Sequence, residues 1–206
     1  EMADERNLEY YYEDDEKNGS HEILLPAVDR IIAEFSPKTV FDLGCGNGSV
    51  AKHLSSRCLV VGIDPSKSAV EIANRAFPEI RIDLGSAYDN LGAKYGAFDM
   101  VLSLEVVEHL YDPRAFARNV YDLLKPGGVA VISTPYHGYI KNLALAVTGK
   151  MDAHFWALWD GGHIKFWSIR TLSLLLEEVG LRVRRFERVG RIPILAKSMI
   201  AVVERP

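Results

Sequence analysis

The chain has few cysteines, no long apolar run and no strong excess of charge of either sign. Its 2 cysteines in 206 residues, Cys45 and Cys58, form neither a zinc-ligand spacing nor a disulfide framework. The formal net charge of −4 indicates no basic surface for a nucleic-acid backbone, and we interpret the arginine-rich segment 181–191 as a solvated strand face. No apolar run approaches the roughly 18 residues of a membrane span. These absences predict a cytoplasmic protein without a nucleic-acid partner.

The length and the apolar content together predict one domain. A chain of 206 residues with 48% hydrophobic residues has the size of a single α/β domain and can bury one core. Within the domain 1–206 we expect an N-terminal leader and helix at 1–36 and an insertion at 136–167.

Short apolar segments alternate with segments of helical period along most of the chain. The apolar segments, each of strand length, are 39–43, 58–63, 80–84, 98–104 and 129–134. The helical segments are 23–35, 48–56, 66–77, 113–124 and 168–179, with a turn expected at 125–128. This alternation predicts an α/β fold with a Rossmann-like, doubly wound and mostly parallel sheet that helices cover on both faces. Two last apolar segments, about 181–189 and 196–203, are joined by so short a link that they must be antiparallel.

Three glycines lie between the first predicted strand and the helix that follows it. Gly44, Gly46 and Gly48 let the backbone approach a ligand closely, beside the unpaired N–H groups of a helix N-terminus. Asp42 precedes them, and its carboxylate suits a cationic ligand better than the pyrophosphate of a dinucleotide. Asp64 ends the second predicted strand about 20 residues beyond the glycines, where an acid can accept both hydroxyls of a ribose. The alternative for Asp64 is a loop residue or a helix cap.

The order of these motifs resembles that of the class I S-adenosylmethionine-dependent methyltransferases. The resemblance covers residues 38–134 and includes FDLGCGNG, VVGIDPS and FDMVLSLEVVEHL, followed by LKPGG. It implies S-adenosylmethionine as the cofactor, with its amino-acid part at the glycine turn, its ribose at the second-strand acid and its adenine beside the residues after the third strand. The implied cofactor residues are Asp42, Gly44, Cys45, Gly46, Asp64, Pro65, Ser66, Ser86, Ala87, Tyr88, Leu104 and Glu105. The sequence departs from the family in LGSAYD, where Ser86 stands in place of a frequent Asp, with Asp83 or Asp89 as alternatives.

Two carboxylates and an imidazole follow the fourth predicted strand, in EVVEHL at 105–110. Together with STPYHGYIKNLALAVTG and GGHIKFWS further on, this segment resembles the O-methyltransferases of ubiquinone biosynthesis, which implies O-methylation of a hydrophobic, catechol-like acceptor. Some members of that group, and the small-RNA 2′-O-methyltransferases, bind a divalent cation through this turn. The matching positions here are Glu105, Glu108, His109 and His163. A cation such as Mg²⁺ held by them would lower the pKa of an acceptor hydroxyl.

Two other interpretations of this turn stay open. Without a metal, His109 is a general base for the acceptor proton, and His163 is a second catalytic residue. In the last interpretation the turn is only structural.

The insertion at 136–167 is too long and too aromatic for a plain connection. It leaves the fifth predicted strand at the edge where open parallel sheets bind ligands, so we expect a substrate lid. A helix pair packed on the sheet edge and a lipid contact through 139–160 are the alternatives. A second aromatic group, at Tyr10, Tyr11, Tyr12 and His21, closes over the cofactor or belongs to an acidic leader.

The sequence therefore predicts an S-adenosylmethionine-dependent methyltransferase that methylates a hydroxyl of a small aromatic or hydrophobic compound. An N- or C-methyltransferase of natural-product or sugar metabolism is the nearest alternative, because loops choose the acceptor. A non-catalytic cofactor-binding protein of the same fold is the other.

Overall fold

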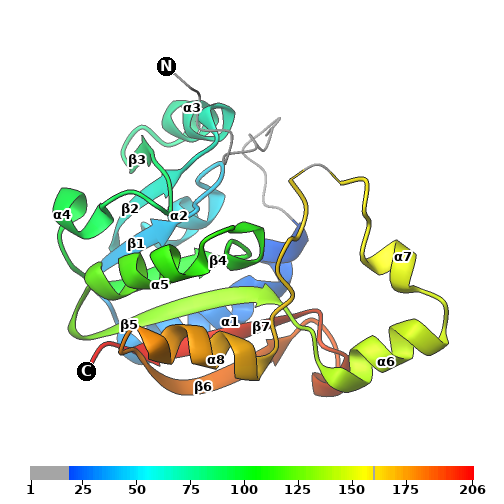
Figure 1. Cartoon of the computed structure of the whole chain (residues 1–206). Coiled ribbons are helices and arrows are strands. Elements are labelled where there is room, and N and C mark those ends of the chain that lie inside the picture. Colours follow the sequence, from blue (N-terminus) through cyan, green and yellow to red (C-terminus); the bar gives the residue numbers. More distant parts are fainter. Residues whose placement is uncertain (1–18, 160) are drawn as a thin grey trace.

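One sheet organises the part of the chain that the computed structural model describes, residues 19–159 and 161–206. Its strand order is β3-β2-β1-β4-β5-β7-β6 (Figure 1). The strands are β1 (Thr39–Leu43), β2 (Leu59–Asp64), β3 (Arg81–Leu84), β4 (Phe98–Leu104), β5 (Leu124–Pro135), β6 (Arg182–Val189) and β7 (Ser198–Glu204). The α-helices are α1 (Gly19–Phe35), α2 (Ser49–Leu54), α3 (Lys67–Ala76), α4 (Leu91–Tyr95), α5 (Pro113–Asp122), α6 (Tyr139–Val147), α7 (Met151–His154) and α8 (Ile169–Glu178). Two 3₁₀ helices are η1 (Val107–His109) and η2 (Pro193–Leu195).

The direction of the strands confirms the predicted topology. Each neighbouring pair from β3 through β2, β1 and β4 to β5 is parallel. The last strand, β7, lies between β5 and β6 and is antiparallel to both. The predicted Rossmann-like fold with an antiparallel last strand is therefore confirmed.

Two apolar cores lie on the two faces of this sheet. Side chains of α1, α2 and α3 pack on one face and side chains of α4, α5 and α8 on the other. Neighbouring residues of one strand enter different cores, as Val40 and Phe41 of β1 do, and both are fully buried. Because successive side chains of a strand point to opposite faces, strands buried on both faces need continuous apolar runs, as the sequence has.

Three local features differ from the predicted elements. The predicted turn at 125–128 is an irregularity inside β5, where the pairing with β4 shifts from Phe98–Leu124 to Met100–Val129. Gly127 N and Arg205 N bond across to Arg205 O and Gly128 O, which keeps this segment at the sheet. The short helix α4 was not predicted, since it has only 5 residues. The 105–110 segment forms the 3₁₀ helix η1 and no α-helical turn.

The insertion after β5 extends away from the sheet (Figure 1). It contains α6 and α7, and the chain then returns past the carboxyl end of β4, where the Ile164 and Lys165 amides both donate to Glu108 O at 2.9 Å. The predicted aromatic group at Tyr10, Tyr11 and Tyr12 lies outside the described residues, and His21 lies in α1. Among the described residues, no helix has the length and apolar character needed to cross a membrane.

Candidate active site

The glycine turn between β1 and α2 is strained in a way that only glycine accepts. Gly44 has a φ of 82°, and a Cβ on it would lie 2.5 Å from Val106 Cγ2. The Gly46 amide donates to Asp64 Oδ2 at 2.8 Å, and the Ser66 amide donates to Asp64 Oδ1 at 2.9 Å. Asp64 therefore braces the turn against the end of β2, and each of its oxygens keeps a lone pair for a further donor.

Asp42 is a buried carboxyl group behind this turn. It is 2% exposed, and its Oδ2 has no hydrogen-bond partner among the described residues. Burial, and secondly the charge of Asp64, raise its pKa to about 7. A cationic group brought to Asp42 would remove this penalty, because an opposite charge favours the ionised carboxylate. The amino group of S-adenosylmethionine is such a group, so the residue fits the cofactor implied by the sequence.

Cys45 has a packing role in the same turn. Its thiol is buried, and burial raises its pKa well above the ordinary value. A Cβ on Gly62 of β2 would lie 2.8 Å from Cys45 Sγ. The side chain therefore fills the space above a glycine of the neighbouring strand and is unreactive at neutral pH.

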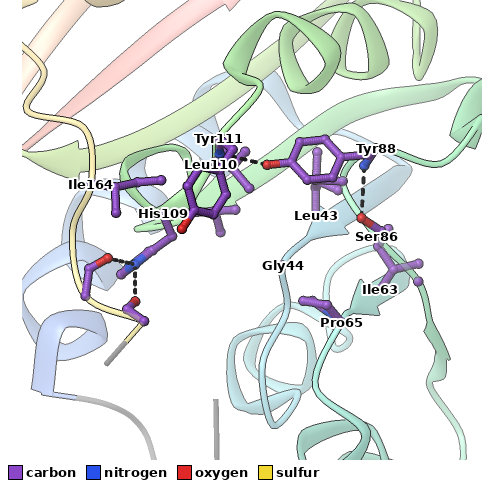
Figure 2. Close-up of a pocket in the computed structure, with 15 residues that line it drawn as sticks. Leu43, Gly44, Ile63, Pro65, Ser86, Tyr88, His109, Leu110, Tyr111 and Ile164 are labelled. Carbon is purple, nitrogen blue, oxygen red and sulfur yellow. Dashed lines mark hydrogen bonds between the residues drawn. The ribbon is translucent and has the colours of Figure 1, made fainter. Parts of the chain in front are cut away.

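The first cavity opens at the carboxyl ends of β1, β2, β3 and β4 (Figure 2). The predicted site residues that line it are Gly44, Pro65, Ser86, Ala87, Tyr88 and His109. The other predicted cofactor residues are not among its lining residues; they are Asp42, Cys45, Gly46, Asp64, Ser66, Leu104 and Glu105. Ser66 caps α3 through its hydroxyl, and Leu104 lies in a core. The structure thus separates the predicted cofactor set into a cavity wall and a supporting layer.

The loop after β3 is held by its own hydrogen bonds. The Tyr88 amide donates to Ser86 Oγ at 3.2 Å, and the Tyr111 amide donates to the Tyr88 hydroxyl at 2.9 Å (Figure 2). Of the two alternatives to Ser86, Asp89 accepts from the Ser86 amide, and Asp83 accepts from Tyr95 and Arg81. Neither aspartate lines the cavity.

Glu105 turns away from the other residues of its segment. It has a φ of 57°, and its carboxylate accepts from the Ser133 hydroxyl at 2.8 Å and from the Ser198 hydroxyl at 3.3 Å. Burial raises its pKa to about 7. The structure therefore does not bring Glu105 into one group with the other predicted metal ligands. Ser133 and Ser198 were missed, since they are ordinary strand residues until β5 and β7 bring them here.

Glu108, His109 and His163 come together at the end of β4. One potential ligand atom from each of them lies within 4.8 Å of the others. Glu108 Oε1 is 3.9 Å from His109 Nε2 and 4.0 Å from His163 Nε2. The backbone bonds from Ile164 and Lys165 to Glu108 O bring His163 to this place.

The Glu108 carboxylate is 1% exposed and poorly compensated. Neither oxygen makes a hydrogen bond of standard geometry among the described residues. Burial, and secondly the charge of Glu105, raise the pKa of Glu108 well above its ordinary value. Its own amide and the Thr134 hydroxyl lower this pKa, but by less. A buried carboxylate in this state favours a nearby cation.

Both imidazoles of this group are neutral near pH 7. His109 Nδ1 lies 3.0 Å from Gly161 O and 3.2 Å from Gly162 O (Figure 2). Because carbonyl oxygens only accept, Nδ1 carries the hydrogen and Nε2 the lone pair. Burial lowers the pKa of His109, and burial together with His109 lowers the pKa of His163 to about 4. Neutral imidazoles with this tautomer can take up a proton or bind a metal ion.

A second cavity lies on the other side of the group. Its wall includes Glu105 and His163 together with residues of α1, α6 and the β6–β7 connection. His109, which lines the first cavity, has its ring 4.9 Å from that of His163. The Glu108–His109–His163 group thus lies between two cavities. This arrangement suits a reaction in which a group passes from one ligand to another.

Aromatic residues of the insertion surround this group. The Trp159 ring lies 5.0 Å from that of His163 and 6.0 Å from that of His109, whereas Trp156 is 62% exposed. A separate cluster, which the sequence did not indicate, stacks His137 on Phe155 and brings His154 and Phe166 to its ring. The insertion therefore contributes directly to the walls of the site.

Comparison with known families agrees with this geometry. Residues 17–185 match the family model described as a methyltransferase domain. The chain belongs to this family. Its class I S-adenosylmethionine-dependent fold and its cofactor, both predicted from the motifs, follow from that membership.

Individual relatives of this methyltransferase domain support the same conclusion. A ubiquinone biosynthesis O-methyltransferase of Caulobacter vibrioides is 36% identical over 122 residues, 57% of this chain and 48% of the relative. One of Dinoroseobacter shibae is 33% identical over 153 residues, 71% of this chain and 61% of the relative. The chain thus spans only about half to three fifths of the length of these curated relatives.

Solved structures show the same fold at lower identity. An S-adenosylmethionine-dependent methyltransferase from Mesorhizobium loti has a TM-score of 0.69 and 18% identity, over 88% of this chain and 97% of that one. The methyltransferase domain of bacterial CtHen1 has a TM-score of 0.63 and 23% identity, over 87% and 96% of the two chains. The fold of this methyltransferase domain is therefore shared with proteins of varied sequence.

Proposed function

We propose that this methyltransferase domain transfers the methyl group of S-adenosylmethionine to a hydroxyl of a small aromatic or hydrophobic acceptor. The observation that carries the proposal is the Glu108–His109–His163 group between two cavities. The curated relatives are named as ubiquinone biosynthesis O-methyltransferases, which supports oxygen as the acceptor atom.

The first cavity is the proposed cofactor site. Gly44, Pro65 and the loop 85–88 would enclose the nucleoside, and Asp64 would offer its remaining lone pairs to the ribose. Asp42 would pair with the amino group, since it is the buried carboxylate that lacks a partner for one oxygen. The cofactor supplies an activated methyl group, so the protein has mainly to align the acceptor and remove one proton.

His109 would accept the proton of the acceptor hydroxyl. Its Nδ1–H is fixed by the Gly161 and Gly162 carbonyls, which orients the basic Nε2 toward Glu108 and His163. A neutral base held in one orientation loses no entropy when the acceptor arrives. Glu108, directly beside it, would stabilise the positive charge that His109 gains with the proton.

A divalent cation bound by Glu108, His109 and His163 is the second form of this proposal. Because Nε2 carries the one nitrogen lone pair of His109, the cation would then replace His109 as the group that lowers the pKa of the acceptor hydroxyl. The poorly compensated carboxylate of Glu108 supports the cation, because a structural turn would instead satisfy it with hydrogen bonds. One carboxylate and two imidazoles suit Mn²⁺, Fe²⁺ or Co²⁺ better than Mg²⁺, which prefers oxygen ligands.

The insertion 136–167 is the proposed lid of the acceptor cavity. Trp159 packs beside both imidazoles, and residues of α6 line the second cavity. A lid in this position would exclude water from the transfer step. The boundaries of a single domain at 1–206 and the lipid contact through 139–160 stay predictions.

Methyl transfer from labelled S-adenosylmethionine to a panel of catechols tests the proposal. We expect a monomethylated oxygen product. We expect His109→Gln to lower kcat by about 10²–10⁴-fold in a variant that still binds S-adenosylhomocysteine. His53→Gln removes an imidazole from α2 outside both cavities and is the matched control. Full turnover in His109→Gln would contradict the role of His109. Transfer only to amines or carbon atoms would support the alternative N- or C-methyltransferase, and cofactor binding without transfer would support a non-catalytic protein.

A further inference from the structure

The second cavity is strongly basic. Four of its lining residues carry a positive charge, namely Lys141, Lys150, Arg191 and Lys197. Among the described residues, its one acidic lining residue is Glu105, whose oxygens already accept from two serine hydroxyls. These cations come from α6, from the turn before α7 and from the β6–β7 connection, so that only the folded chain collects them in one place.

Lys141 is the most constrained of these cations. It is 8% exposed, and its ammonium donates to Tyr136 O at 2.8 Å and to Lys197 O at 3.4 Å. Two carbonyl oxygens orient an ammonium group without neutralising it, and a third N–H remains for a ligand. Among the described residues Lys141 forms no ion pair. Glu105 is the carboxylate whose charge acts on it, and its oxygens already accept from two serine hydroxyls. Burial of an ammonium group without an anion is costly, so a function that brings an anion is the natural explanation.

The arginines of the neighbouring strand β6 differ from the cations of the second cavity in their ion pairs. On β6, Arg184 pairs with Glu204 and Arg185 pairs with Glu34. Arg191 follows the same strand by two residues, yet in the described part of the chain it has no ion pair. Among the described residues, Arg184 and Arg185 of β6 are therefore paired with carboxylates, whereas Arg191 of the second cavity is not.

We propose that the methyl acceptor carries an oxyanion, a carboxylate or a phosphate-type group, that binds Lys141 and Arg191 while its hydroxyl lies at His163 and Glu108. The inference rests on the proposed function for placing the acceptor in the second cavity. His163 and Glu105 line one part of that cavity, next to the transfer site, and the same cavity includes Lys141 and Arg191. Ile23, Leu145 and Leu195 provide apolar walls for an aromatic ring between the two groups.

Three matched catechols test this inference. They are 3,4-dihydroxybenzoate, 3,4-dihydroxyphenylphosphonate and the neutral 3,4-dihydroxybenzamide, titrated into the full chain saturated with S-adenosylhomocysteine. Quenching of tryptophan fluorescence reports binding without turnover, because Trp159 lies beside His163. We expect at least one anionic catechol to bind about fivefold more tightly than the amide, the factor that corresponds to about 1 kcal/mol from an ion pair of this kind. The carboxylate and phosphonate arms distinguish the two sources of the oxyanion.

Arg191→Gln should reduce the preference for the anion to about twofold or less and leave binding of the amide unchanged. Arg75→Gln removes the same charge from the exposed end of α3, outside the second cavity, and should preserve the preference. Lys141→Met should act like Arg191→Gln, and a thermal unfolding scan shows whether that buried site still folds. Equal binding of all three catechols, or an equal loss for anion and amide in Arg191→Gln, would overturn the inference. An anion preference with no methyl transfer would support it and contradict the proposed function instead.

Discussion

Asp42→Asn is expected to stabilise the cofactor-free protein at pH 8 and to weaken cofactor binding. The pKa of Asp42 rises from 3.8 to about 7 on folding because the group is buried. The folded chain therefore binds this proton more tightly than the unfolded chain. The contribution of Asp42 to stability is therefore greatest below pH 4 and is lost as the pH rises through 7. A shift of about 3 units corresponds to about 4 kcal/mol at 1.36 kcal/mol for each unit.

The net gain in the variant is smaller than this shift. Asparagine leaves a buried amide that lacks a full set of hydrogen bonds, which costs about 1–3 kcal/mol. At pH 8 we expect Asp42→Asn to raise the free energy of unfolding by about 2 kcal/mol, or the melting temperature by about 4–8 °C for a chain of this length. At pH 4 the wild type should be at least as stable as the variant.

Cofactor binding should change in the opposite direction. In the wild type, affinity for S-adenosylhomocysteine should increase from pH 5.5 to pH 7.5, because the ionised carboxylate is the form that pairs with the amino group. The variant should bind at least tenfold more weakly at pH 7.5 and show little dependence on pH. Calorimetry and thermal unfolding at both pH values measure these quantities. Asp122→Asn, on the exposed end of α5, is the control. A variant less stable than the wild type at pH 8, or one with unchanged affinity, would refute the reasoning.

Three further predictions concern the metal, the packing and the insertion. Mn²⁺ at a concentration of about 100 times its dissociation constant should stabilise the wild type by about 2.7 kcal/mol in a thermal unfolding scan. It should not stabilise Glu108→Gln, and equal stabilisation of both proteins would argue against the three-residue metal site. Gly62→Ala places a Cβ 2.8 Å from Cys45 Sγ and should lower the free energy of unfolding, measured by denaturant titration, by about 1–3 kcal/mol. An unchanged midpoint would contradict the close contact between Cys45 and Gly62. Val147→Glu, at a residue of α6 that is 78% exposed, should reduce sedimentation with phospholipid vesicles, whereas Leu174→Glu on α8, which is 58% exposed, should not. The lipid contact is wrong if both variants behave like the wild type.

The sheet was predictable because its strands are buried on both faces. β1 and β4 begin and end where the apolar runs do, and β2 and β3 differ from their predicted bounds by one residue. The predicted helical segments 66–77 and 168–179 begin at Ser66 and Ser168, whose hydroxyls cap α3 and α8, because a capping residue is local in sequence. The helix α4 and the irregularity in β5 were not predicted, since α4 is short and the irregularity depends on pairing with β4 and contacts with Arg205.

The candidate site could be predicted only in part, because some of its contacts join segments that are far apart in sequence. The spacing within 105–110 suggested one group of ligands, but Glu105 binds Ser133 and Ser198 from distant strands. His163 reaches Glu108 because the returning insertion pairs its amides with the Glu108 carbonyl. No sequence pattern near Lys141 or Arg191 indicated that they line one cavity.

The sequence by itself determined the class of fold, the glycine turn, the acid at the end of the second strand and the imidazole after the fourth. Each of these depends on residues close together in the chain, whose periodicity and spacing record local structure. The tertiary structure alone decided which carboxylate faces the imidazoles, where the two cavities lie and which cations of the described residues line the second one. Those properties depend on contacts between segments far apart in sequence, and burial then changes the charge state of the residues it brings together.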